Sequence, residues 1–259
     1  MANIFIQFNM KEGYIAILDS GIGGISILKQ MMEQMPNEKY LYLGDNKNAP
    51  YGNLSDLQLT LLSLKNIDLI KRYPIKALVI GCNTLSVRVR KIIAEYSGVK
   101  TFCLFPPVEK LAIESEKTLM LSTVKTAQIY KFIYKDIKNL TVVGLKMFAQ
   151  DIEKNTFNLD LIDINQNLQP ENIVVYGEFI DRKGYYDNVI LGCSHYFFVK
   201  NKITNHFCPR KVCCGDNYTV KFVYEYLKNK KSLEKIKRNE VLFIGESAKI
   251  NKYFFEKGG

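Results

Sequence analysis

The chain has 259 residues, of which 47% are hydrophobic and 24% charged, and its formal net charge is +10. This composition excludes an intrinsically disordered chain, and the length suffices for one large domain or two smaller ones. No apolar run reaches the roughly 18–20 residues of a membrane span, and no basic segment followed by a long apolar core opens the chain, so we expect a cytoplasmic protein without a membrane partner.

The excess of lysine and arginine favours either nucleic-acid binding or a solvated basic surface. The lysines are scattered, apart from one cluster near the end of the chain: Lys228, Lys230, Lys231, Lys235, Lys237 and Arg238. We therefore expect a solvated surface and no nucleic-acid partner. A positive field would also attract an anionic substrate.

The six cysteines do not have the density of a disulfide framework, so we expect reduced thiols. His206, Cys208, Cys213 and Cys214 are close in sequence, but their spacing matches no common zinc pattern. The sequence also carries no signal of an organic cofactor. We expect neither a metal nor a cofactor.

Apolar runs and amphipathic stretches alternate along the first hundred residues. In chain order, we expect a strand at Tyr14–Leu18, a helix at Ile25–Met35, a strand at Lys39–Leu43, a helix at Ser55–Arg72, a strand at Ala77–Ile80 and a helix from 83 to about Tyr96. Strands that alternate with helices of about 10–18 residues are typical of βαβ units and a parallel sheet.

The alternation restarts near Lys100, after which Pro106-Pro107 interrupts it. The expected strands are Thr101–Phe105, Thr118–Leu121, Asn139–Val143, Ile173–Tyr176, Val189–Leu191 and Glu240–Gly245. One expected helix starts at about Ala127, and another covers Tyr218–Leu227. We predict an α/β fold of two similar lobes, each a largely parallel sheet flanked by helices, with the active site in the cleft between them. The predicted divisions are an N-terminal extension (1–13), a first lobe (14–100 and 212–259) and a second lobe (101–211).

Two of the predicted strands end in the same pattern. Residues 77–84 are Ala-Leu-Val-Ile-Gly-Cys-Asn-Thr, and residues 188–195 are Asn-Val-Ile-Leu-Gly-Cys-Ser-His. One cysteine at a strand end is commonly a core residue, but two in matching contexts indicate facing thiols, which can move a proton from one face of a carbon to the other. A thiol has an ordinary pKa of about 8.5, and we expect the helix N-terminus after each cysteine to lower it. Asp19 and His195 are candidates to orient or shuttle the proton.

Polar motifs follow several predicted strands, at the edge where open α/β sheets bind ligands. The segment Asp19-Ser20-Gly21-Ile22-Gly23-Gly24 lacks the spacing of a dinucleotide-binding loop, but its glycines permit a sharp turn into a helix N-terminus that favours a small anion. The alternative is a tight turn in which Asp19 or Ser20 caps the helix. The other motifs are Gly44-Asp45, Cys82-Asn83-Thr84, Ser122–Thr126 and Cys193-Ser194-His195.

In this order the motifs resemble those of the cofactor-independent glutamate racemases, within the aspartate/glutamate racemase superfamily, over nearly the whole chain after residue 13. The further matching segments are Ala49-Pro50-Tyr51-Gly52, Ser122-Thr123 with Thr126, and Cys214-Gly215-Asp216. The resemblance implies that L-glutamate and D-glutamate are interconverted without a cofactor and that D-glutamate is supplied for peptidoglycan synthesis. It does not decide whether the protein forms a homodimer.

The same resemblance implies roles by position. Cys82 and Cys193 would be the two acid/base residues, and in the family the first takes the α-proton from D-glutamate and the second from L-glutamate. Asp19 would support Cys82, and His195 would support Cys193. Glu153 matches a family glutamate near the histidine. The residues that would line the substrate are Ser20, Pro50, Tyr51, Gly52, Asn83, Thr84, Thr123, Thr126 and Ser194.

The sequence departs from the family pattern in several places. The departures are Ser194 for a threonine, Leu85 for an alanine, Phe105-Pro106-Pro107 for a glycine-containing segment, Lys146–Gln150 without the usual proline elements, and Arg88 in a helix near the site. Two alternatives stay open: a racemase of aspartate or another acidic amino acid, and a diverged homologue of low activity that binds a ligand or partner. A single-thiol hydrolase that uses Cys193 and His195 would leave Cys82 and its motif unexplained.

Overall fold

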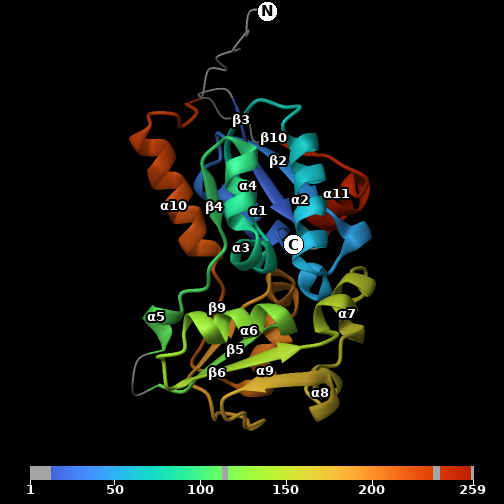
Figure 1. The fold of residues 1–259 in the computed structure, drawn as a ribbon, viewed down its shortest axis with the longest axis vertical. Coiled ribbons are helices and arrows are strands. Elements are labelled where there is room, and N and C mark those ends of the chain that lie inside the picture. Colours follow the sequence, from blue (N-terminus) through green and yellow to red (C-terminus); the bar gives the residue numbers. More distant parts are fainter. Residues whose placement is uncertain (1–12, 113–115, 236–239, 258–259) are drawn as a thin grey trace, which may run out of the picture.

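The computed structural model describes residues 13–112, 116–235 and 240–257. The predicted N-terminal extension lies outside these ranges except for Gly13, and so do Lys237 and Arg238 of the basic cluster. Two five-stranded sheets form two lobes, one above the other along the long axis of the molecule (Figure 1). In the described ranges, no helix is long and apolar enough to cross a membrane.

The first lobe contains a parallel sheet with the strand order β10-β2-β1-β3-β4. Its strands are β1 (Tyr14–Asp19), β2 (Lys39–Gly44), β3 (Ile75–Ile80), β4 (Thr101–Cys103) and β10 (Glu240–Phe243). Its helices are α1 (Ile25–Gln34), α2 (Asp56–Ile70), α3 (Asn83–Arg88), α4 (Arg90–Ser97), α10 (Asp216–Asn229) and α11 (Ala248–Lys257). Ile15 and Ile17 of β1 share a core cluster with α1 and α10, whereas Ala16 and Leu18 share one with α2 and α4. Both faces of the sheet are therefore covered by helices, as parallel sheets require.

The second lobe has the strand order β7-β6-β5-β8-β9, in which β7 is antiparallel to β6 and the other neighbours are parallel. Its strands are β5 (Thr118–Thr123), β6 (Leu140–Leu145), β7 (Ile173–Tyr176), β8 (Asn188–Leu191) and β9 (Lys211–Cys213). Its helices are α5 (Val108–Leu111), α6 (Val124–Ile133), α7 (Phe148–Lys154), α8 (Ile164–Asn167) and α9 (Lys200–Phe207). These sheets and helices confirm the predicted α/β fold of two largely parallel lobes.

The structure differs locally from the predicted elements. The helix predicted from residue 83 to about Tyr96 is divided at Val89, whose φ of −130° lies outside the helical region. Val87 and Val89 are β-branched, and such residues lower the helix propensity at this point. The short strand β4 pairs with β3 of the first sheet, and the short strand β9 pairs with β8 of the second. After each of them the chain passes to the other lobe. The predicted lobe boundaries fall at these two strands and stay a prediction.

Candidate active site

Both Gly-Cys motifs lie at the junction of the two lobes. Cys82 follows β3 of the first lobe, and Cys193 follows β8 of the second. The two residues are 4% and 8% exposed, and they are close enough for the charge of Cys193 to raise the pKa of Cys82. Helices α3 and α6 meet across the same junction (Figure 1). The two thiols that the sequence pattern singles out therefore lie near each other in the fold.

The environment of Cys82 disfavours the thiolate. Burial raises the pKa of the Cys82 thiol to about 11, and the charge of Asp19 contributes in the same direction. Hydrogen bonds from Ser20 and from the backbone of Leu85 act in the opposite direction. The N-terminus of α3 does lower the pKa of this thiol, through the backbone N–H of Leu85, but the removal of the sulfur from water outweighs this effect and the pKa is raised.

Asp19 is fully buried at the end of β1. Its Oδ1 accepts a hydrogen bond from the backbone N–H of Gly21 at 2.8 Å, and its Oδ2 accepts one from the Ser194 hydroxyl at 3.2 Å. Burial raises the pKa of the Asp19 carboxyl, although the charge of His195 opposes this rise. The carboxyl of the first lobe is thus bonded to the residue that follows the cysteine of the second lobe.

A histidine and a glutamate lie behind Cys193. His195 Nδ1 is 3.7 Å from Cys193 Sγ, and His195 Nε2 is 2.6 Å from Glu153 Oε1. Burial by itself lowers the pKa of His195, but its contacts with Cys193 and Glu153 raise that pKa well above the usual value. Burial by itself raises the pKa of Glu153, but His195 outweighs it and the pKa is lowered. His195 and Glu153 therefore form an ion pair of imidazolium and carboxylate.

Glu153 also connects the two lobes. It lies on α7 of the second lobe, and its Oε1 accepts a hydrogen bond from the backbone N–H of Ile22 at 3.0 Å. Its Oε2 accepts one from Asn46 Nδ2, also at 3.0 Å. Ile22 belongs to the loop that follows Asp19, so the partner of His195 holds the loop beside the other cysteine.

Hydroxyl and amide groups from both lobes line the junction. The Thr84 and Thr126 hydroxyls are 2.9 Å apart, and the Thr123 hydroxyl donates to Thr126 Oγ1 at 2.9 Å. Asn83 Nδ2 donates to the Tyr130 hydroxyl at 3.0 Å, whereas the buried Asn83 Oδ1 has no hydrogen-bond partner within the described part of the chain. Tyr130 is missing from the predicted site residues, although its position four residues after Thr126 puts both on one face of α6.

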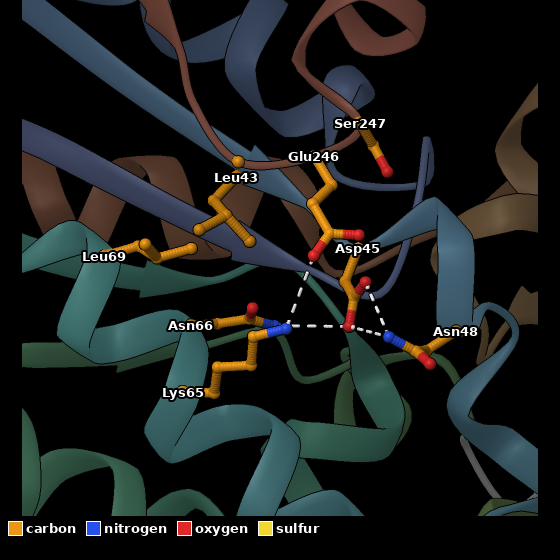
Figure 2. A pocket seen from close by; sticks show the side chains of 10 residues that line it. Leu43, Asp45, Asn48, Lys65, Asn66, Leu69, Glu246 and Ser247 are labelled. Atoms are coloured by element: carbon orange, nitrogen blue, oxygen red, sulfur yellow. Dashed lines mark hydrogen bonds and ion pairs between the residues drawn. The ribbon is translucent and has the colours of Figure 1, made fainter.

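Asp45 organises the loop that carries Pro50 and Tyr51. Its carboxylate accepts hydrogen bonds from Asn48 Nδ2 at 2.9 Å and from the Tyr51 hydroxyl at 2.6 Å. Asp45, Asn48 and Asn66 line a cavity (Figure 2), whose volume of about 20 Å³ is room for a single water molecule. Tyr51 is buried by this arrangement and Pro50 is half-buried. Contacts within the first lobe therefore hold this loop in place.

Two glycines allow the backbone of the first lobe to approach side chains of the second. A Cβ atom on Gly23 would lie 2.2 Å from Ser194 Oγ, and one on Gly52 would lie 2.5 Å from Thr123 Oγ1. Neither separation is compatible with a side chain at these positions, so the close contact of the lobes requires glycine at both.

The loop after β1 has no side-chain cap. Helix α1 begins at Ile25, and Gly24 occupies its N-cap position without a capping hydrogen bond from any side chain of the described ranges. The alternative in which Asp19 or Ser20 caps this helix is therefore wrong. The carboxylate of Asp19 bonds instead to the N–H of Gly21, and anion binding by the loop stays a prediction.

Metal-ligating side chains do not gather in the described part of the chain: no group of three or more His, Cys, Asp and Glu residues could hold an ion there. His206 Nε2 lies 2.6 Å from Asp181 Oδ1, and Cys208 is exposed. His206, Cys208, Cys213 and Cys214 are thus close in sequence but do not form a metal-binding group in this part of the structure.

No family model matches the chain. A glutamate racemase of Clostridium perfringens (strain ATCC 13124) is 31% identical to it over 211 residues, which cover 76% of this chain and 76% of the relative. The chain belongs to the glutamate racemase family. A glutamate racemase of Buchnera aphidicola subsp. Acyrthosiphon pisum (strain 5A) is 29% identical over 247 residues, covering 91% of this chain and 92% of the relative. Membership of this family confirms the predicted amino-acid racemase.

Solved glutamate racemases share the fold. The enzyme of Francisella tularensis, crystallised with D-glutamate, superposes with a TM-score of 0.74 at 22% identity and covers 95% of each chain. The enzyme of Escherichia coli, crystallised with L-glutamate and the activator UDP-MurNAc-ala, has a TM-score of 0.73 at 18% identity and covers 95% of this chain and 96% of its own. The likeness extends over nearly the whole of both lobes.

The contact between Gly52 and Thr123 gives a test of lobe closure in this racemase. We expect Gly52→Ala to lower kcat/KM about 5- to 150-fold, because overpacking of this size costs about 1–3 kcal/mol and destabilises the closed arrangement of the lobes. Asn53→Ala, at the exposed next residue, is the matched control and should leave kcat/KM unchanged. Equal kinetics of the two variants would mean that the lobes do not meet here in the active enzyme.

Proposed function

We propose that the protein interconverts L-glutamate and D-glutamate in the cytoplasm by a two-cysteine acid/base mechanism and thereby supplies D-glutamate for peptidoglycan synthesis. The observation that carries the mechanism is the pair of buried thiols at the lobe junction, each with its own titratable neighbour. The proposed catalytic residues are Cys82, Cys193, Asp19, His195 and Glu153. Those proposed to line the substrate are Ser20, Pro50, Tyr51, Gly52, Asn83, Thr84, Thr123, Thr126 and Ser194.

The reaction moves one proton off the α-carbon and puts another on its opposite face. In the direction from D-glutamate, the Cys82 thiolate takes the α-proton and the Cys193 thiol gives its proton to the other face. In the direction from L-glutamate, the two cysteines exchange these roles. A base matched to a weakly acidic carbon must itself be strongly basic when deprotonated, and the raised pKa of Cys82 fits this requirement.

The two cysteines have different neighbours. Asp19 is an anion close to Cys82, whereas His195 is a cation in contact with Cys193. A cation next to a sulfur stabilises its thiolate, and an anion favours the thiol. This supports Cys82 as the thiol that keeps its proton in the resting enzyme and gives it to the substrate, which is the role proposed for it in the direction from L-glutamate.

Carbanion character at the α-carbon needs stabilisation by hydrogen bonds to the α-carboxylate, since no cofactor is proposed to delocalise the charge. The candidates are the hydroxyls of Thr84 and Ser194, the amide of Asn83 and the backbone N–H groups beside them. Closure of the lobes excludes water and strengthens these interactions. The buried Asn83 Oδ1, unpaired within the described part of the chain, is an acceptor available to the substrate ammonium group.

The test is the circular dichroism of L-glutamate in the presence of the purified protein. We expect the signal to decay to zero as the two enantiomers reach equal concentrations, with no cofactor added. L-aspartate is followed in parallel: a faster decay with aspartate would favour the alternative racemase. Glutamate binding by calorimetry without any decay would instead favour the diverged binding protein.

A further inference from the structure

Lys125 has an unusual position on α6. It is the second residue of this helix (Val124–Ile133), whose first turn contains no acidic residue. The N-terminal end of a helix carries a partial positive charge, so a lysine there is unfavourable for the helix itself. The hydrogen-bond partners of this cation lie outside α6.

The ammonium group of Lys125 reaches across the lobe junction. Its Nζ donates hydrogen bonds to the carbonyl oxygens of Asn53 at 3.1 Å and Leu54 at 3.0 Å. These carbonyls end the 3-10 helix η2 (Tyr51–Asn53), in which Gly52 packs against Thr123. Thr123, which directly precedes α6, and Lys125 within α6 thus hold the same short turn, which we call the 51–54 turn, by packing and by hydrogen bonds.

A second cation holds the 51–54 turn from its own lobe. Arg88 of α3 donates from Nη2 to the Leu54 carbonyl at 2.8 Å and forms an ion pair with Asp56 at 2.6 Å. The Arg88 side chain is only 6% exposed, so this contact is fixed within the first lobe. Lys125 shares the Leu54 oxygen with Arg88 but belongs to the second lobe. The bond from Lys125 therefore exists only while the lobes are together, whereas the bond from Arg88 does not depend on their separation.

Substrate access requires the lobes to separate. Both cysteines are buried at the junction, and residues of the 51–54 turn stand among those proposed to line the substrate. A contact that is made only in the closed arrangement raises the population of that arrangement. The substrate enters the open arrangement but is held between the cysteines in the closed one, so the apparent affinity for substrate rises with the population of the closed arrangement.

We propose that Lys125 is a positioning residue that fastens the 51–54 turn to α6 and so sets the equilibrium between open and closed lobes. This inference rests on the proposed function in one respect: the substrate is taken to bind between the two cysteines. Lys125 itself touches neither cysteine nor the hydroxyl groups at the junction in any described contact. Its effect is therefore on KM, while the chemistry in the closed enzyme, and with it kcat, is retained.

The kinetic test compares Lys125→Met with Lys125→Arg and with Lys135→Met. Methionine keeps the length of the side chain and removes its donors, arginine keeps the donors, and Lys135 is an exposed lysine of the same lobe. We expect Lys125→Met to raise KM for glutamate about 3- to 10-fold, the effect of losing hydrogen bonds of ordinary net strength, with kcat within about twofold of wild type. Arginine should restore most of the affinity, and Lys135→Met should behave as wild type. An unchanged KM in Lys125→Met would overturn the proposal.

The second measurement does not need turnover. Alkylation of Cys82 and Cys193 by iodoacetamide, without substrate, is followed by peptide mass mapping, with the exposed Cys208 as internal reference. We expect Lys125→Met to accelerate alkylation of both buried cysteines several-fold relative to Cys208. An increased KM with unchanged alkylation would also overturn the proposal, since Lys125 would then act on the substrate and not on lobe closure. Faster alkylation in a protein whose wild type does not racemise glutamate would retain Lys125 as the fastening residue and reject the proposed function.

Discussion

Replacement of either cysteine by alanine should abolish racemisation: we expect Cys82→Ala and Cys193→Ala each to reduce kcat at least about 10³-fold, as loss of an acid or base at the reacting carbon does. Both variants should remain folded, because each change removes a single sulfur at the junction of the lobes. Circular dichroism of glutamate measures the rate from either enantiomer. Cys208→Ala, at an exposed cysteine after α9, is the matched control and should leave the rate unchanged.

The single-cysteine variants should nevertheless exchange protons in D₂O. In Cys193→Ala, Cys82 can still remove the α-proton of D-glutamate and return a deuteron to the same face, so we expect slow deuterium incorporation into D-glutamate alone. Cys82→Ala should show the same for L-glutamate. The measurement is the loss of the α-proton signal in the NMR spectrum. Exchange of both enantiomers in one variant would contradict the assignment of one thiol to each face.

Replacement of Glu153 should give the second largest effect. We expect Glu153→Gln to lower kcat/KM about 10- to 100-fold, because the glutamine keeps the hydrogen bond to His195 but loses the charge that stabilises the imidazolium. The two directions must lose kcat/KM equally, since the enantiomers have the same free energy. Glu171→Gln, at an exposed glutamate of the same lobe, should have no effect.

The pH profile of Glu153→Gln tests the reason for this loss. In the wild type, Glu153 helps to hold the pKa of His195 well above its usual value, so the imidazolium persists as pH rises. Without the carboxylate that pKa falls, and His195 loses its proton at a lower pH. We therefore expect the alkaline limb of kcat/KM, measured between about pH 6 and 10, to move to lower pH. A limb that stays in place would show that the protonated His195 is not required.

Much of the fold and part of the candidate site could be predicted because their signals are local. The apolar runs predict the strands, and the repeated Gly-Cys ends single out Cys82 and Cys193 without any knowledge of their separation in space. The pKa of Cys82 could not be predicted, because burial depends on packing from both lobes while the helix end is visible in the sequence. Glu153 comes only from the family resemblance, since nothing local connects it with His195.

Tyr130 escaped prediction for a similar reason. It meets Asn83 across the junction, and this contact depends on chain segments that come together only in the folded protein. The spacing of Tyr130 from Thr126 on α6 is the one local signal that could have indicated it.

The hydrogen bonds around Asp19 and Glu153 cross over between the two halves of the site. Ser194, next to one cysteine, donates to the carboxyl beside the other, and Glu153 behind His195 holds the loop that follows Asp19. A substitution that adjusts one half will therefore disturb the other. We therefore expect substitutions in such a site to occur in pairs, one in each half. The serine at position 194, which bonds to Asp19 in the other half, is the first position at which we expect such a pair.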